Sequence, residues 1–313
     1  MATAAVLGSD NPVGAAIARR LRNDGHEVIE ASAKSASLEL KASLASSTVI
    51  VHAGDASDTE TVLDVAAGIG VEHIVLLSSA AVYGAWADNP VPLTEDAVLR
   101  PNLGILAVAE RAEIERRSQE WGFDHPGVGL AILRPCTVVV PGGDDWPSDD
   151  LDGIAGLGSG DGARPVQFLH IDDLASAVSV AVTNNVRGVR NVAPAGWITE
   201  DEARALSGGR VVALPEPVRR AARRVTLGKT VDRGVAALSS HPWVVASDAL
   251  RAEGWAPVYD NREALVATRR PTWWQRLSPT KRQELSMAVV GGAAVVAIVA
   301  AALGIRRKRR ARS

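Results

Sequence analysis

A glycine-rich turn near the N-terminus holds the first residues that could bind a reactive group. The stretch 7–14 (LGSDNPVG) lies between an apolar run and an Ala-rich stretch with helical spacing, which predicts a strand-to-helix turn. The backbone N–H groups of such a turn and the positive end of the helix dipole can hold a pyrophosphate. A turn that binds nothing is the alternative. The candidate phosphate-binding residues are Gly8, Asp10, Asn11, Val13 and Gly14.

Asn11 is the unusual member of this turn. It stands at the middle glycine position, where it tolerates left-handed backbone geometry but adds a side chain. Glycines matter here because a phosphate must approach the backbone closely. The turn on its own is therefore a weak signal, and its meaning depends on the rest of the chain.

An acidic, Gly-rich loop between residues 144 and 162 is a second stretch with chemical potential. Carboxylates suit hard cations, but these lack the fixed spacing of a metal-binding motif, so we predict a solvated loop and no metal site. A diphosphate ligand would be repelled there unless Arg164 or a cation compensates the charge. The aspartates are Asp144, Asp145, Asp149, Asp150, Asp152 and Asp161.

Short apolar runs alternate with helical stretches over the first 135 residues. This pattern predicts an α/β fold in which βαβ units build a parallel sheet and position the turn. Further along, a helix is expected from Leu174 with Asp172 and Asp173 as its caps. The expected strands are 4–7, 25–29, 48–53, 72–78 and 129–140, and the expected helices are 12–23, 58–69, 100–121 and 174–183.

The composition limits the class of protein. The formal net charge is −2, so no long-range attraction to nucleic acid is expected. The single cysteine, Cys136, excludes an internal disulfide framework and fits a reducing compartment. The N-terminal residues lack the basic and apolar regions of a signal peptide, so we expect the globular part in the cytoplasm.

The C-terminal end carries an uncharged apolar run, residues 287–305 (MAVVGGAAVVAIVAAALGI). As a helix it would span about 28 Å, close to the thickness of the bilayer hydrocarbon. A buried core helix is the alternative, but the run has no polar face and only a basic tail, 306–313, follows it. We predict one transmembrane helix after a linker, 266–286, although both flanks are basic and the orientation conflicts with a strict positive-inside rule.

Five motifs in a fixed order resemble the extended short-chain dehydrogenase/reductase family, and most closely the NAD-dependent epimerase/dehydratase proteins. They are the glycine turn, 25–29 (GHEVI), 78–84 (SSAAVYG), 133–135 (LRP) and 168–178 (FLHIDDLASAV), and 253–265 (EGWAPVYDNREAL) also fits. The resemblance covers residues 3–265. It implies a Rossmann-type, doubly wound parallel sheet that binds a nucleotide cofactor, with a small C-terminal substrate lobe mainly from residue 141 onward.

The resemblance also implies a Ser, a Tyr and a Lys that exchange a proton with the substrate while nicotinamide transfers hydride. Ser79 matches the serine, but Ala107 stands at the tyrosine position and Arg111 at the lysine position. Alanine cannot donate a proton, and arginine stays charged and bonds differently from lysine. The chain has two tyrosines, Tyr83 and Tyr259, and Tyr83 remains a candidate substitute.

Cofactor recognition departs from the family pattern as well. The position that holds the ribose hydroxyls after the second strand falls on Ser32, with Glu30 before it. Lys34 follows and would tolerate a 2′-phosphate, which favours NADP slightly over NAD. Besides NADP and NAD, a third possibility is that the cleft binds no nucleotide.

Two functions follow from these observations. The first is a membrane-anchored NAD(P)-binding protein without the usual catalysis, a pseudoenzyme that acts as a nucleotide-sensing or scaffolding subunit of a membrane complex. The second is an active oxidoreductase or epimerase that uses other proton donors on a lipid-linked or sugar substrate. A docking module with an empty cleft stays open beside them.

Overall fold

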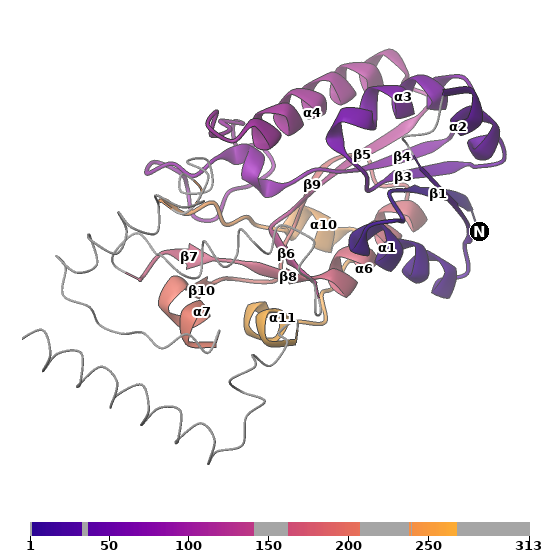
Figure 1. The fold of residues 1–313 in the computed structure, drawn as a ribbon. Coiled ribbons are helices and arrows are strands. Elements are labelled where there is room, and N and C mark those ends of the chain that lie inside the picture. Colours follow the sequence, from indigo (N-terminus) through magenta and orange to yellow (C-terminus); the bar gives the residue numbers. More distant parts are fainter. Residues whose placement is uncertain (1, 33–36, 141–161, 207–237, 239, 268–313) are drawn as a thin grey trace, which may run out of the picture. The chain divides into compact units, whose positions relative to one another are not determined.

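The computed structural model describes residues 2–32, 37–140, 162–206, 238 and 240–267. A parallel sheet of six strands lies at the centre of the described fold (Figure 1). The strands follow the order β2-β1-β3-β4-β5-β9, and every neighbouring pair is parallel. They are β1 (Thr3–Leu7), β2 (Glu27–Ala31), β3 (Val49–His52), β4 (His73–Leu77), β5 (Gly129–Pro135) and β9 (Gly188–Val192).

Helices cover both faces of this sheet, as Figure 1 shows. One core joins alternate residues of β1 and β3 to α1 (Pro12–Asn23) and α6 (Ile171–Thr183). A second core joins the opposite face to α2 (Ser37–Leu44), α3 (Thr59–Ala67) and α4 (Leu106–Asp124). Because parallel strands are buried on both faces, β1 and β3 are apolar almost throughout. The architecture is a Rossmann-like α/β fold.

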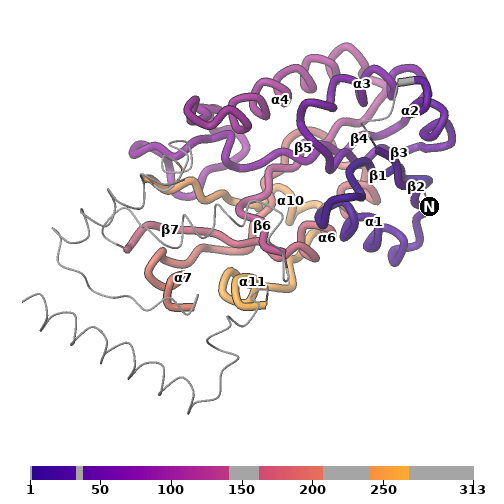
Figure 2. Tube along the Cα trace, in the orientation of Figure 1, coloured from indigo at the N-terminus to yellow at the C-terminus, as the bar shows by residue number. Residues whose placement is uncertain are grey.

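A smaller group of elements packs beyond the carboxyl end of β5. The strand β6 (Thr137–Val139) pairs with β8 (Phe168–His170), and β7 (Pro165–Val166) pairs with β10 (Ile198–Thr199). Helices α7 (Glu200–Leu206) and α11 (Asn261–Ala267) share a third core with these strands. Figure 2 follows the chain from residue 240 through α10 (Asp248–Ala252) to α11. The described residues also form two 3₁₀ turns, η1 (Ala56–Asp58) and η2 (Ala80–Tyr83).

Most of the expected elements are present, and α1 has the predicted limits. Several limits differ by one or two residues, and three elements depart further from the prediction. The helix expected from residue 100 begins at Leu106, because Asn102 holds Ala85 N–H through its side chain and Ile105 N–H through its carbonyl. The strand expected over 129–140 is two strands, which part at Cys136. The helix expected from Leu174 begins at Ile171.

The caps of that last helix also differ from the prediction. His170, not an aspartate, is the N-cap, since its Nδ1 accepts a hydrogen bond from Asp172 N at 3.2 Å. The buried Asp173 carboxylate instead accepts from Val258 N at 2.8 Å and Tyr259 N at 2.9 Å. Asp173 therefore connects the segment at Val258 and Tyr259 to α6. The elements α2 and β9 were not predicted at all.

The apolar run 287–305 lies outside the described residues, as do the linker beyond residue 267 and the basic tail. Most of this stretch belongs to a second unit of the chain, Arg270–Ser313. Within the described residues, no helix combines the length and apolar character that crossing a bilayer requires. The transmembrane helix remains a prediction from the sequence.

Candidate functional site

The glycine turn between β1 and α1 is built for close backbone approach. Gly8 has φ of +88°, and a Cβ there would lie 2.7 Å from Gly54 Cα. A Cβ on Gly14 would lie 2.1 Å from the carbonyl oxygen of Gly8. Neither position has room for a side chain, because real Cβ contacts do not fall below about 3 Å. The first turn of α1 therefore packs directly against the end of β1, at the carboxyl edge of the sheet.

Asn11 closes this turn through its side chain. Its Oδ1 accepts from Gly14 N at 2.9 Å and its Nδ2 donates to Ala53 O at 2.8 Å. The residue has φ of −98°, so it caps α1 from an extended conformation and does not use the left-handed geometry that the sequence suggested. Asp10 is exposed beside it, whereas the Val13 side chain is fully buried and leaves only its main chain toward the turn.

The residues after β2 define the predicted ribose position. Ser32 is exposed, and Lys34 lies outside the described residues. Glu30 is paired with Arg22, whose guanidinium, followed by the Ser9 hydroxyl, holds the pKa of that carboxyl below its usual range. The Glu30 carboxylate is thus already engaged by two groups of the protein.

Ser79 follows β4 closely and is partly exposed at the carboxyl edge of the sheet. Its Oγ accepts from Ala81 N at 3.2 Å and so caps the short turn η2. Ala107, in the first turn of α4, is exposed, and Arg111 lies one turn further on the same helix face. Arg111 Nη1 donates to Leu77 O at 3.0 Å, which brings its guanidinium to the end of β4.

Tyr83 is not available as a substitute proton donor in this structure. Its side chain is 0% exposed, its hydroxyl donates to Asn191 Oδ1 at 2.9 Å, and it accepts from Arg134 Nη1 at 2.8 Å. Burial also raises the pKa of this phenol. Tyr259 stacks on His170 in the smaller group of elements, with ring centroids 4.0 Å apart. Neither tyrosine stands in for the phenol that Ala107 lacks.

Arg134 and Glu115 form a buried ion pair; a salt bridge at Arg134 was expected from the sequence, but its partner Glu115 was not identified. Both side chains are 3% exposed, and Glu115 Oε2 accepts from Arg134 Nη2 at 2.6 Å and from Nε at 2.9 Å. Ser78 donates its hydroxyl to the same carboxylate. The guanidinium also lies 4.9 Å from the centre of the Tyr83 ring. This network ties β4, β5 and α4 together directly behind Ser79.

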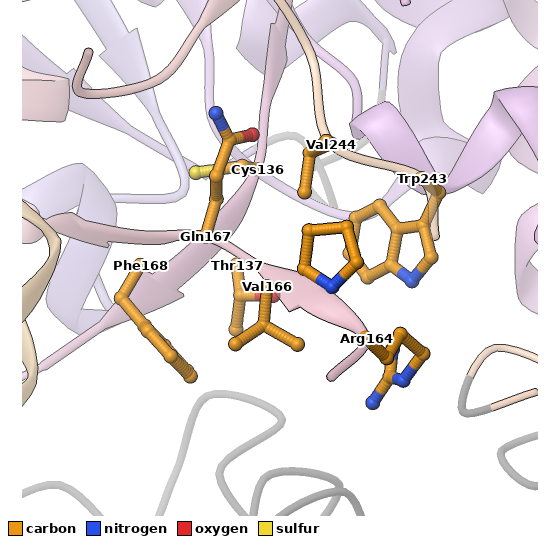
Figure 3. A pocket seen from close by; sticks show the side chains of 9 residues that line it. Cys136, Thr137, Arg164, Val166, Gln167, Phe168, Trp243 and Val244 are labelled. Atoms are coloured by element: carbon orange, nitrogen blue, oxygen red, sulfur yellow. The ribbon is translucent and has the colours of Figure 1, made fainter. Parts of the chain in front are cut away.

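A small hollow lies in the smaller group of elements, between β6, β7 and the segment around Trp243. Figure 3 shows Trp243 and Arg164 on one side and Phe168 on the other, with Thr137 and Val166 between. Arg164 Nε donates to Glu200 Oε2 at 3.2 Å, so its charge is already balanced. The sequence suggested Arg164 as a residue that compensates the negative charge of the acidic loop. That loop, residues 144–161, lies outside the described residues.

Metal ligation is a separate question. Among the residues that the structure describes, no three His, Cys, Asp or Glu side chains gather in a group that could hold a metal ion. Cys136 is buried, which raises the pKa of its thiol, so it is a packing residue.

The class of protein follows from these observations. Six parallel strands, helices on both faces and a tight glycine turn at the carboxyl edge define a Rossmann-like α/β protein with a nucleotide-type turn. Comparison with known proteins is more specific: residues 48–193 match the NAD dependent epimerase/dehydratase family. The match supports the resemblance that the sequence motifs carry.

Two relatives of this chain have no described function. The uncharacterized protein y4nG of Sinorhizobium fredii is 30% identical over 238 residues, which cover 69% of this chain and 57% of that protein. An uncharacterized protein of Mycobacterium tuberculosis is 28% identical over 146 residues, 46% of this chain and 39% of its own. The chain thus spans less than two thirds of the length of either relative.

Solved structures establish the fold further. The UDP-glucose 4-epimerase of Thermus thermophilus, in complex with NAD, has a TM-score of 0.65 at 19% identity, covering 85% of this chain and 97% of its own. The dTDP-glucose 4,6-dehydratase DesIV of Streptomyces venezuelae, with NAD bound, has a TM-score of 0.65 at 18% identity, covering 85% and 95%. At this identity the likeness concerns the fold alone.

Proposed function

We propose that this chain is a membrane-anchored NAD(P)-binding protein that lacks the phenol–ammonium proton relay of the family it resembles. It would act as a nucleotide-sensing or scaffolding subunit of a membrane complex. One observation carries the proposal: Ala107 is exposed where a phenol is needed, while Tyr83 is fully buried and bonded to Arg134 and Asn191.

The residues present fit a nucleotide cofactor. The cradle at Gly8 and Gly14 has no room for a Cβ, and such closeness of strand and helix is what phosphate-binding turns of this fold require. When bound, a nicotinamide cofactor supplies hydride-transfer chemistry. The turn residues would hold its phosphates, and Ser32 with Lys34 would meet its ribose. The NAD-bound neighbours favour NAD, whereas Lys34 favours NADP, so the relative affinity for NADH and NADPH decides between them.

The second candidate function, an active oxidoreductase or epimerase, rests on Ser79. This hydroxyl is retained and partly exposed at the carboxyl edge, although the phenol of the nearby Tyr83 is buried and bonded to Arg134 and Asn191. The two functions differ in turnover. We expect the purified chain, incubated with NAD and UDP-glucose or dTDP-glucose, to form no epimerised or dehydrated product above background.

A matched pair of variants makes this test decisive. Product formation that disappears in Ser79→Ala would overturn the proposal and establish an enzyme. Loss of the same activity in Tyr83→Phe, with the fold retained by circular dichroism, would assign the proton transfer to that buried phenol. Absence of product with all three proteins, together with saturable nucleotide binding, is the outcome that the proposal expects.

Membrane attachment is proposed from the apolar run 287–305, whose length suits a bilayer. A chain that ends at Glu284 should move from the membrane fraction to the soluble fraction of a cell lysate. A chain that lacks only the basic tail 306–313 is the control and should stay with membranes. If the shorter chain also stays with membranes, a different element anchors the protein and this part of the proposal fails.

A further inference from the structure

Arg111 is a partly buried cation without a carboxylate partner among the described residues. Its one hydrogen bond there joins Nη1 to the carbonyl oxygen of Leu77, and it forms no ion pair with them. Other sheltered arginines have such partners: Arg134 pairs with Glu115, Arg164 with Glu200, and Arg190 with Glu253. A charge withdrawn from water without a counter-charge is costly, so the environment of Arg111 is electrostatically incomplete.

The nearest carboxylates do not fill this role. Glu115 lies one turn further along α4, but its oxygens are committed to Arg134 and Ser78. Burial is the largest influence on the Arg111 guanidinium and lowers its pKa, with Glu115 and Asp55 opposing it only from a distance. The described part of the chain therefore keeps a cation at the end of β4 and supplies no anion in contact with it.

A small hollow, with space for little more than one water-sized atom, adjoins this guanidinium. It lies between the carboxyl ends of β3 and β4 and the inner face of α4, and Arg111, His52, Gly54, Thr59, Ser78 and Ser118 are among its lining residues. Its place at the carboxyl edge of the sheet is where ligands of open α/β folds bind. Gly54, on its wall, also abuts Gly8 of the glycine turn.

His52 adds an unused polar atom to the same hollow. Its Nε2 lies 3.0 Å from Asp55 O, and a carbonyl can only accept, so Nε2 carries the proton and the neutral ring keeps Nδ1 as an acceptor. That Nδ1 is buried and has no partner in the described structure. Burial lowers the pKa of this ring, which maintains the neutral form. A ligand oxyanion that reaches this hollow would satisfy Arg111.

Ala107 leaves the approach to Arg111 open. It lies four residues before Arg111, on the same face of α4, and its side chain is a single exposed methyl group. A phenol at this position would fill more of the space on this helix face than a methyl group does. The two departures from the family motif thus share one face of α4: Ala107 leaves it less crowded, and Arg111 places a fixed positive charge there.

We propose that Arg111 binds a ligand oxyanion, phosphate or carboxylate, which reaches the hollow beside Ser78 and supplies the missing counter-charge. The inference rests on the proposed function in that the ligand shares the nucleotide cleft. The oxyanion belongs either to the cofactor or to a second, acidic ligand. Guanidinium is suited to both, because its planar fork matches phosphate and carboxylate geometry.

Calorimetric titration of the detergent-solubilised full chain with inorganic phosphate, in a buffer without other oxyanions, tests the inference. We expect saturable binding that weakens at least tenfold in Arg111→Met and only partly in Arg111→Lys. Arg117→Met, which removes an exposed cation from the same helix, should bind phosphate as the wild type does. Unchanged phosphate affinity in Arg111→Met, or no binding by the wild type, overturns the inference.

A second arm with NADH separates the source of the oxyanion and the fate of the proposed function. Phosphate that competes with NADH supports the cofactor as the source, while phosphate that binds alongside saturating NADH supports a second, acidic ligand. If phosphate binding is lost in Arg111→Met but the wild type does not bind NADH, the proposed function is contradicted and the oxyanion site is supported. If the wild type binds NADH but phosphate binding does not depend on Arg111, the oxyanion site is contradicted and nucleotide binding is supported.

Discussion

Replacing Gly14 with alanine is expected to weaken nucleotide binding at least tenfold, about 1.4 kcal/mol. The added methyl group would lie 2.1 Å from the carbonyl oxygen of Gly8 and 2.5 Å from its carbonyl carbon. Both are backbone atoms, so the clash cannot be relieved by a side-chain rotation. The start of α1 must move away from the end of β1, and the phosphate-binding turn opens as a result.

The control for this change is Gly127→Ala. A Cβ there meets no atom within 4 Å, so binding and stability should stay close to those of the wild type. NADH affinity by calorimetry and helix content by circular dichroism are measured for both variants. Undiminished affinity in a folded Gly14→Ala protein would mean that the nucleotide does not use this turn.

Replacing Glu115 with glutamine should lower the free energy of unfolding by about 3–5 kcal/mol, the cost of leaving a buried charge unpaired. The amide matches the carboxylate in size but removes the counter-charge of Arg134, and both side chains are only 3% exposed. The loss would be measured by urea unfolding followed by circular dichroism.

Two further variants isolate the cause. Glu113→Gln removes a half-exposed carboxylate from the same helix, where solvent screens its ion pairs, and should change the stability little. The double variant Glu115→Leu with Arg134→Met should recover much of the loss, since paired replacement by apolar groups is often neutral. A Glu115→Gln protein as stable as the wild type would show that the pair is not the tie between β4, β5 and α4.

The sequence predicted the sheet, the glycine turn and α1 because these depend on local signals. Apolar runs recur where strands must be buried on both faces, and Asn11 followed by Pro12 is a local start signal for a helix. The same local reasoning misplaced the start of α6, because Asp is a favoured N-cap type and His is not. In the structure His170 is the N-cap, and Asp173 instead accepts hydrogen bonds from the distant residues Val258 and Tyr259.

Long-range contacts also explain what the sequence did not predict. Strand β9 lies at the sheet edge and contains the polar residues Arg190 and Asn191, so its sequence lacks the apolar pattern of a buried strand. In the structure these side chains bind distant partners: Arg190 pairs with Glu253, and Asn191 accepts a hydrogen bond from Tyr83. In the sequence Glu115 is one of several charged residues on a polar helix, and no local pattern identifies Arg134 as its partner. The placement of Ala107 at the phenol position rests on the sequence motif and stays a prediction; the structure shows that Ala107 is exposed in the first turn of α4.

The central claim is that a working nucleotide cleft persists where no phenol reaches the substrate position. The most direct measurement is a calorimetric titration of the detergent-solubilised full chain with NADH and NADPH. The account predicts saturable, one-to-one binding of at least one of them, weakened at least tenfold in Gly14→Ala and retained in Tyr83→Phe. No heat of binding from either nucleotide at millimolar concentration would contradict it and leave a fold whose cleft has no cofactor.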